Sequence, residues 1–319
     1  MNICVTGACG YIGSSLIAQL QKLSDVDMIY AFDNLIYNQG PNIYHVMSGS
    51  KVVFYNEDVT GWSKKLIYAI QDSDVIVPLA ALVGAPICGK RFNSAMITNF
   101  TWFGTLMEKI KTQLILYPNT NSGYGTTGSE ICTEETPIVP LSHYAKTKQW
   151  TEELLLKEYD NVICFRLATV FGTSYRNRLD LLVNNLTYRA VKENHIEIFD
   201  GDFRRNYIHV DDICRAFIMG FRGMFEKGQV YNLGNDSINM SKRMLAETIS
   251  RTTGTKWTEN FEKWITDADK RDYIVSSEKI MSRGFEPTRN LEYGIRQIMD
   301  FCKYLSKDES QMESMYNYR

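Results

Sequence analysis

Short apolar runs alternate with amphipathic stretches through the first half of the chain. The apolar runs have the length of buried strands, whereas the stretches between them repeat apolar residues at helical spacing. Strands are expected near 2–6, 28–32, 51–55, 74–79, 113–118 and 161–165. Helices are expected between them, near 13–22, 62–71, 93–111 and 142–158. This alternation predicts an α/β fold, a Rossmann-like doubly wound parallel sheet with helices on both faces.

The second half of the chain is less regular. Helical patterns fall near 179–192, 210–222, 241–253, 276–283 and 291–305, and residues 230–234 form another strand-like run. Residues 307–319 are polar and are expected to fray. Because 319 residues are many for one compact unit, we expect one large domain or two coupled domains.

The composition narrows the possible classes of function. A net charge of −2 argues against a general nucleic-acid binder and against a polybasic membrane anchor. No apolar stretch has the length of a membrane span, and no secretory signal is recognisable. Seven cysteines without a C-x-x-C pair indicate reduced thiols, so a cytoplasmic location is expected. The four histidines lack ligand-like spacing, and no metal site is expected.

A glycine-rich loop follows the first expected strand. Gly7, Gly10 and Gly13 lie between an apolar run and an amphipathic stretch, which predicts a strand, a tight turn and a helix. Glycine is needed where the backbone takes a positive φ or where a phosphate approaches it closely. The start of a helix there supplies unpaired N–H groups for a pyrophosphate. A glycine triplet alone is also compatible with a strand–helix turn that binds nothing.

Asp33 ends the second expected strand, twenty positions beyond Gly13. In dinucleotide-binding folds an acidic residue at about this distance binds the ribose hydroxyls of the cofactor. A carboxylate would repel a 2′-phosphate, so the spacing favours NAD over NADP. A solvated aspartate in a turn is the alternative.

Tyr144 and Lys148 lie one turn apart on one face of the helix expected at 142–158. A free tyrosine titrates near ~10, and a neighbouring ammonium group favours the phenolate. The pair can therefore take a proton from a substrate hydroxyl while a hydride leaves the same carbon. Thr120 follows the fifth expected strand, at the sheet edge where ligands bind, and is expected to orient that hydroxyl. Tyr144, Lys148 and Thr120 are the expected catalytic residues.

These motifs resemble the extended short-chain dehydrogenase/reductase family, and within it the NAD-dependent nucleotide-sugar epimerase/dehydratase group. The resemblance extends over nearly the whole chain and includes Tyr124-Gly125 and the segment 205–212. It implies an NAD-binding Rossmann domain at 1–170, with returning segments at about 206–235, and a smaller substrate-binding domain at 171–205 and 236–306. The cofactor-binding residues that it implies are Gly7, Gly10, Tyr11, Ile12, Gly13, Asp33, Asn34, Asp58, Val59, Leu79, Ala80, Ala81, Asn99, Tyr144 and Lys148.

The resemblance also implies a nucleotide-diphosphate sugar as the substrate. Arg205 and Arg271 match arginines that hold its diphosphate, a role that suits the planar guanidinium fork. Asn185 and Leu186 resemble the segment that contacts the nucleobase end. The expected substrate-binding residues are Val83, Asn121, Ser122, Thr169, Arg178, Asn185, Leu186, Arg205 and Arg271.

Two departures from the family pattern narrow the function. Asn121 and Ser122 stand where 4,6-dehydratases of this family have an aspartate and a glutamate, and neither titrates near neutrality. Thr169 stands where many 4-epimerases have a substrate-binding asparagine, so their sugar preference is not carried over. The leading hypothesis is an epimerase that acts through a 4-keto sugar, most simply at C4. A nucleotide-sugar 4-dehydrogenase and a non-catalytic nucleotide sensor stay open, and the family resemblance implies a homodimer.

Overall fold

Seven parallel strands form the central sheet of the computed structural model, which describes residues 1–39, 44, 46–261, 271–305 and 309–317. In spatial order the sheet runs β11-β7-β5-β4-β1-β2-β3, with every neighbouring pair parallel. Its strands are β1 (Asn2–Thr6), β2 (Met28–Asp33), β3 (Val52–Asn56), β4 (Val75–Pro78), β5 (Leu114–Thr120), β7 (Val162–Leu167) and β11 (Gln229–Leu233). The predicted doubly wound parallel sheet is confirmed, with strand ends within about two residues of those expected.

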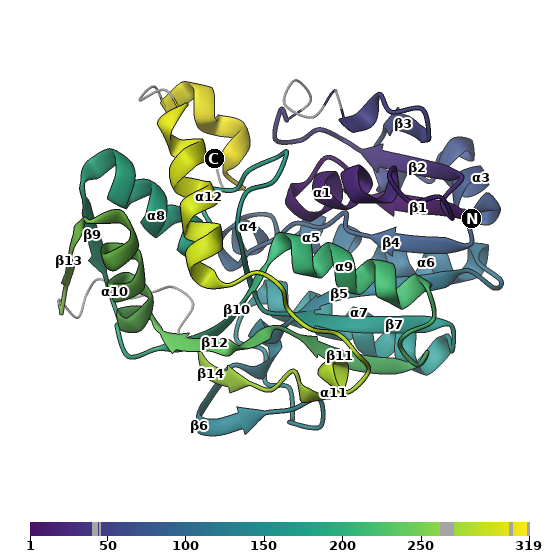
Figure 1. Cartoon of the computed structure of the whole chain (residues 1–319). Helices are drawn as coiled ribbons and strands as arrows, with labels where there is room; N and C mark the ends of the chain where they lie inside the picture. The colour runs from purple at the N-terminus through teal and green to yellow at the C-terminus, as the bar shows by residue number, and fades with distance from the viewer. Residues whose placement is uncertain (40–43, 45, 262–270, 306–308, 318–319) are drawn as a thin grey trace.

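Helices cover both faces of this sheet (Figure 1). On one face, α1 (Tyr11–Leu20) and α9 (Val210–Phe221) bury residues such as Leu16 and Phe217 against the strands. On the other face, α3 (Lys64–Asp72), α6 (Trp102–Lys109) and α7 (His143–Glu158) do the same with residues such as Leu66 and Leu155. The two cores are separate clusters, as expected for a sheet that is buried on both sides.

The helix expected at 93–111 is present but contains a π-helical turn. It consists of α5 (Phe92–Met96), a π-helical turn η2 (Ile97–Thr101) and α6, which follow one another without a gap. A separate short helix that was not expected, α4 (Ala85–Lys90), precedes it. Gly84, at φ +111°, and a proline in the first turn set the start of α4. In the π-helical turn the side chain of Asn99 is buried, and π-turns of this kind are common at functional sites.

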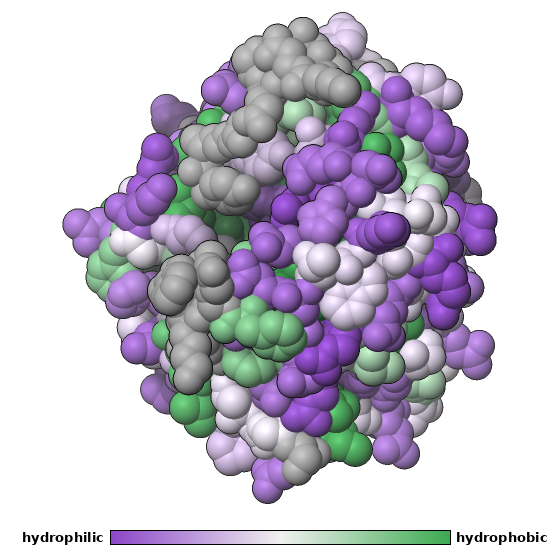
Figure 2. Space-filling view, turned by 90° about the vertical axis from the view of Figure 1, so that its left-hand side faces the viewer, coloured by the Kyte–Doolittle hydropathy of each residue, from purple (hydrophilic) through white to green (hydrophobic). Residues whose placement is uncertain are grey.

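A smaller lobe packs beside one end of the sheet (Figure 1). Its elements are β8 (Thr169–Phe171), α8 (Leu182–Glu193), β9 (His195–Ile198), β10 (Arg204–His209), β12 (Asn235–Ser241), α10 (Lys242–Thr253), β13 (Lys256–Glu259) and α12 (Leu291–Lys303). A third core cluster joins α8, α10 and α12 to these strands. The face of this lobe in Figure 2 is mainly hydrophilic, with hydrophobic side chains in small separate groups.

Shorter elements complete the chain. They are η1 (Val59–Gly61), η3 (Asn121–Tyr124), β6 (Thr126–Cys132), β14 (Asp272–Val275), α11 (Glu278–Met281) and η4 (Glu309–Met315). Parallel pairing of β14 with β6 brings two distant parts of the chain together. No helix in the part of the chain that the structure describes is long and apolar enough to cross a membrane.

The structure of the C-terminal segment differs from the one predicted from the sequence. Sequence analysis predicts a frayed tail from residue 307, whereas η4 is a 3-10 helix and Met312 and Tyr316 are buried against Leu179. Apolar side chains in a mostly polar stretch thus find a specific partner loop, which local composition does not reveal.

Candidate active site

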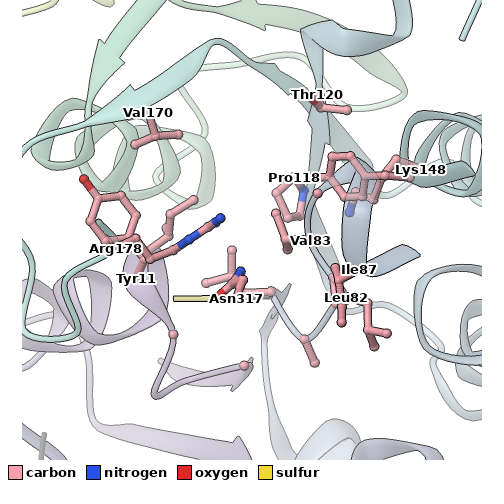
Figure 3. A pocket seen from close by; sticks show the side chains of 18 of the residues that line it. Tyr11, Leu82, Val83, Ile87, Pro118, Thr120, Lys148, Val170, Arg178 and Asn317 are labelled. Atoms are coloured by element: carbon pink, nitrogen blue, oxygen red, sulfur yellow. The ribbon is translucent and has the colours of Figure 1, made fainter. Parts of the chain in front are cut away.

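A cleft of about 790 Å³ opens at the carboxyl ends of the parallel strands, between the sheet and the smaller lobe. Strand order reverses between β1 and β4, and ligands of open α/β sheets bind at this reversal. The loop after β1 and the segment after β4 both line the cleft. Side chains from β5, α7 and β8 close its far side (Figure 3).

The glycine loop forms the floor of the cleft. Gly7 has φ +67°, and a Cβ atom there would lie 2.5 Å from the backbone nitrogen of Ala80. A Cβ atom on Gly13 would overlap the carbonyl oxygen of Gly7. Helix α1 starts after Gly10 without a side-chain cap, so its first N–H groups are available to a ligand. These features fit the diphosphate of a dinucleotide.

Asp33 sits at the end of β2 with 7% of its surface exposed. Its carboxylate accepts hydrogen bonds from Cys9 N at 2.9 Å and from Leu35 N at 2.8 Å. Burial raises the pKa of Asp33, while these N–H donors act in the opposite direction. The geometry holds a carboxyl group beside the glycine loop, where a ribose would lie.

The rim next to Asp33 is a polar network. Asn34 Nδ2 donates to Asp58 Oδ2 at 2.8 Å, and Asp58 Oδ1 accepts from Thr60 N at 2.8 Å. Burial acts to raise the pKa of Asp58, but hydrogen bonds from Thr60 and Asn34 outweigh it and the pKa is lowered. Val59 follows in the cleft wall, and its carbonyl accepts from Trp102 Nε1 at 3.0 Å.

Asn99 supports the wall of the cleft without lining the cleft itself. It does not line the cleft, and its side chain binds both backbone groups of Leu82, with Oδ1 accepting at 2.9 Å and Nδ2 donating at 3.0 Å. The Thr151 hydroxyl of α7 donates to the Asn99 carbonyl at 2.6 Å. The π-helical turn therefore fixes the segment containing Leu79, Ala80 and Ala81, which does line the cleft.

Helix α7 carries Tyr144 and Lys148 into the cleft. Ser142 caps the helix by accepting from Ala145 N at 3.2 Å, which fixes the first turn. Lys148 is 3% exposed, and its ammonium lies 4.1 Å from the ring centre of Tyr117. Burial lowers the pKa of Lys148 to about 7, so the group is easily deprotonated near neutral pH.

Two cations that were not expected beside Tyr144 act on its pKa. Burial raises the pKa of Tyr144, and Arg178 and Arg271 lower it through their charges. Sequence analysis gave the pKa-lowering role to Lys148. The two arginines come from the smaller lobe, where only a folded chain brings them to the phenol.

Thr120 lines the cleft, whereas Asn121 and Ser122 do not. The Thr120 and Ser122 hydroxyls lie 2.8 Å apart. The short helix η3 begins directly after Thr120 and turns the next two side chains inwards, so both are fully buried. Asn121 Nδ2 donates to Asn206 Oδ1 at 3.2 Å. A direct substrate contact, as expected for Asn121 and Ser122, does not fit these positions.

Basic side chains from the smaller lobe line the opposite wall. Arg205, Arg271 and Arg178 all face the cleft. Arg178 pairs with Asp180, with Nη2 to Oδ2 at 2.6 Å. Val83, Thr169 and Asn185 line the cleft as expected. The prediction that Leu186 binds substrate is wrong, because Leu186 does not line the cleft. It points into the core of the smaller lobe, because the next residue on a helix is turned by about 100°.

Several lining residues were missed by sequence reasoning. They include Tyr37, Gln39, Arg176, Lys242, Tyr273 and Asn317. Each comes from a loop or from a distant part of the chain, and none lies in a motif with a fixed spacing. Their contacts depend on the folded arrangement of the two lobes.

Three comparisons place these features among known proteins. The family model described as "NAD dependent epimerase/dehydratase family" matches residues 3–234. The low-salt glycan biosynthesis protein Agl12 of Haloferax volcanii is 27% identical, over 97% of this chain and 100% of its own length.

Solved structures are similar to this chain in both sequence and fold. UDP-glucuronic acid 4-epimerase from Bacillus cereus, in complex with UDP-glucuronic acid and NAD, is 28% identical with a TM-score of 0.84, covering 96% of this chain and 100% of its own. The dTDP-glucose 4,6-dehydratase from Bacillus anthracis, in complex with NAD, is 25% identical with a TM-score of 0.81, covering 97% and 98%.

Proposed function

Because this chain belongs to the NAD dependent epimerase/dehydratase family, we propose that it is an NAD-dependent nucleotide-sugar epimerase that acts at C4 through a 4-keto sugar. The observation that carries the proposal is the meeting of Thr120, Tyr144 and Lys148 with the glycine loop in one cleft. The similarity to a UDP-glucuronic acid 4-epimerase supports it.

The cofactor fits the residues that are present. The glycine loop, Asp33 and the Leu79–Ala81 segment, which line the cleft together, would hold a dinucleotide of the NAD type. Bound there, NAD would supply a reversible hydride acceptor and a positive charge.

The chain's own residues handle the proton. Tyr144 removes it from the C4 hydroxyl and later returns it, while the Thr120 hydroxyl orients that oxygen. In the cleft without ligands burial keeps Tyr144 a neutral phenol, so ionisation needs positive charge nearby. Arg178 and Arg271 supply part of that charge. Lys148 on the same helix face adds to it only in its protonated form.

Substrate binding falls to the smaller lobe. Arg205 and Arg271 offer guanidinium groups to a diphosphate. Asn185, which lines the same cleft, is assigned to the nucleobase end. Lys242 lies in the same wall. The sugar is thus held between arginines of one lobe and Tyr144 of the other.

A dehydratase is disfavoured by the loop after β5. Removal of water across C5–C6 needs an acid and a base beside the sugar. Asn121 and Ser122 occupy those sequence positions, do not titrate near neutral pH, and are buried outside the cleft. The chain therefore shares the fold of the 4,6-dehydratases among the similar proteins but has no acid–base pair at these two positions.

The test is a product assay with purified protein. UDP-glucose, UDP-galactose and UDP-glucuronic acid are each incubated with the enzyme and NAD, and products are analysed by mass spectrometry and by chromatography that resolves C4 epimers. We expect an epimer of unchanged mass, and a loss of about 10²-fold or more in rate for Tyr144→Phe. A product lighter by two hydrogens would instead identify a dehydrogenase. If no epimer forms, or if Tyr144→Phe matches the wild type, the proposal is wrong.

The proposal extends to the setting of the enzyme. All seven cysteines are free and buried, which supports a reducing, cytoplasmic compartment. Exposed apolar side chains on α5, η2 and α7, among them Phe92, Ile97 and Trp150, support a homodimer formed through these helices.

A further inference from the structure

The end of the chain forms part of the cleft wall. Asn317 follows η4 and lines the cleft. Figure 3 places it between Tyr11 and Arg178 on one side and Val83 and Ile87 on the other. Asn317 therefore lines the same cleft as the glycine loop, although about 300 positions separate the two in sequence.

This C-terminal segment is anchored to the loop after β8. Leu179 N donates to the Met315 carbonyl at 2.9 Å. Leu179, Met312 and Tyr316 form a small apolar cluster in which the first two are 1% exposed. Burial of one such side chain is worth roughly 1.5–3 kcal/mol, so the segment has a defined resting place.

Arg176 joins the segment to the cofactor end of the cleft. It is 3% exposed, its Nε donates to the Ser314 carbonyl at 2.8 Å, and its Nη1 donates to Asn317 Oδ1 at 2.7 Å. Its guanidinium carbon lies 4.8 Å from the ring centre of Tyr37. Its backbone N–H donates to Ser14 Oγ on α1 at 3.3 Å.

One donor of this guanidinium has no acceptor. Nη2 of Arg176 is buried and lacks a hydrogen-bond partner within residues 1–39, 44, 46–261, 271–305 and 309–317. Burial lowers the pKa of Arg176 to about 10, so the group is still charged at neutral pH. A buried donor without an acceptor is costly. An oxygen of a ligand in the cleft would satisfy it.

We propose that residues 309–317 are part of the cofactor site, with Asn317 and Arg176 contacting bound NAD and the segment slowing its release. The proposal relies on the proposed function only for the identity of the cofactor. A segment that rests on the loop of Arg176 and reaches the cleft beside the glycine loop would hinder the departure of a ligand bound there.

The test measures cofactor release directly. Protein loaded with NADH is mixed with excess NAD, and the loss of bound NADH fluorescence gives the dissociation rate. Met312→Asp places a charge in the buried anchor, and Asn317→Ala removes the contact in the cleft. We expect release to be about tenfold faster in each, equivalent to about 1.4 kcal/mol. Glu313→Ala, at an exposed position of the same segment, should release NADH at the wild-type rate.

The outcomes separate the two proposals because the assay needs no sugar nucleotide. Melting temperatures measured without cofactor show whether each variant is folded. If Met312→Asp is unfolded, Asn317→Ala decides the matter, because it leaves the apolar anchor intact. Unchanged or slower release in folded variants overturns the role of the segment. Wild-type protein that binds no NADH overturns the cofactor assignment itself.

Discussion

At the residue scale, the fold buries the ammonium group of Lys148 although burial disfavours its charged form. Its ammonium is buried against Tyr117, and burial lowers its pKa to about 7 from the ordinary 10.5. The charge of Glu152 acts in the opposite direction but does not compensate. Folding therefore costs free energy at this position wherever the unfolded chain carries a protonated lysine.

We predict that Lys148→Met stabilises the cofactor-free protein while its activity falls by about 10²-fold or more. The folded protein releases a proton that the unfolded chain retains between pH 7 and 10.5, so wild-type stability rises with pH in that window. The gain from methionine is expected to be largest at or below pH 7, on the order of 1–4 kcal/mol, and to shrink towards pH 10.5. Urea denaturation at pH 6, 8 and 10 measures it. A variant less stable than wild type at pH 7 would contradict this account.

Gly13 gives a second prediction at this scale. A Cβ atom there would overlap the Gly7 carbonyl oxygen and lie 2.8 Å from the Ala8 carbonyl oxygen. We expect Gly13→Ala to cost about 1–3 kcal/mol of stability by overpacking and to weaken NAD binding at least tenfold, measured by calorimetry. Gly89→Ala is the matched control, because nothing lies within 4 Å of its Cβ position. Equal NAD affinity in both variants would contradict the role of the glycine loop in binding NAD.

Sequence reasoning located the residues whose chemistry depends on local spacing. Gly7, Asp33, Tyr144 and Lys148 all line the cleft, because each lies at a strand end or on one helix face. It was wrong for Leu186, where one residue of helical rotation decides between cleft and core. Such rotation cannot be predicted from a helix pattern whose ends are uncertain by a few residues.

At the scale of elements, a buried ion pair fixes α7 to the sheet. Glu152, one turn beyond Lys148, accepts from Arg166 of β7 with Nη2 to Oε1 at 2.7 Å, and from Asn119 Nδ2 at 2.6 Å. Arg166 Nη1 also donates to Tyr124 OH at 2.9 Å. This network holds the helix that carries Tyr144 at a fixed height over β5 and β7.

We predict that Glu152→Gln destabilises the protein by about 3–5 kcal/mol, because Arg166 is left buried without a counter-charge. Glu193→Gln breaks an exposed pair with Arg189 on α8 and is expected to cost no more than about 0.5 kcal/mol. Guanidinium denaturation compares the two. Similar losses would mean that the buried pair contributes nothing special.

The elements themselves were largely predictable, for a physical reason. Buried parallel strands are continuous apolar runs, and such runs marked all seven strands of the sheet. In the region 85–109, the separate helix α4 and the π-helical turn η2 were not predicted, and the turn goes with contacts of Asn99 with Leu82. A tertiary hydrogen bond of this kind leaves no trace in hydrophobic periodicity.

At the scale of the whole molecule, the surface of α5, η2 and α7 predicts self-association. Ile97 is 50% exposed there. We expect sedimentation equilibrium to show a dimer, and Ile97→Glu to weaken it at least tenfold, or about 1.4 kcal/mol. Met281→Glu, on α11 and 40% exposed, is expected to leave the dimer unchanged. A monomer at high concentration would refute the homodimer.

Arrangements between distant segments were beyond the reach of the sequence. The C-terminal segment, the approach of Arg178 and Arg271 to Tyr144, and the pairing of β14 with β6 all join parts of the chain that share no local pattern. The domain boundaries stay a prediction for the same reason.

The fixed position of α7 has one further consequence for an epimerase. Because Tyr144 cannot follow the sugar, the keto intermediate must pivot about its own diphosphate to present its other face. Under the proposed function Arg205 and Arg271 would act as a tether, and the length of time they hold the diphosphate would set how often the keto intermediate escapes into solution. Stereochemical fidelity in this molecule would thus be decided at the end of the substrate farthest from the bond that changes.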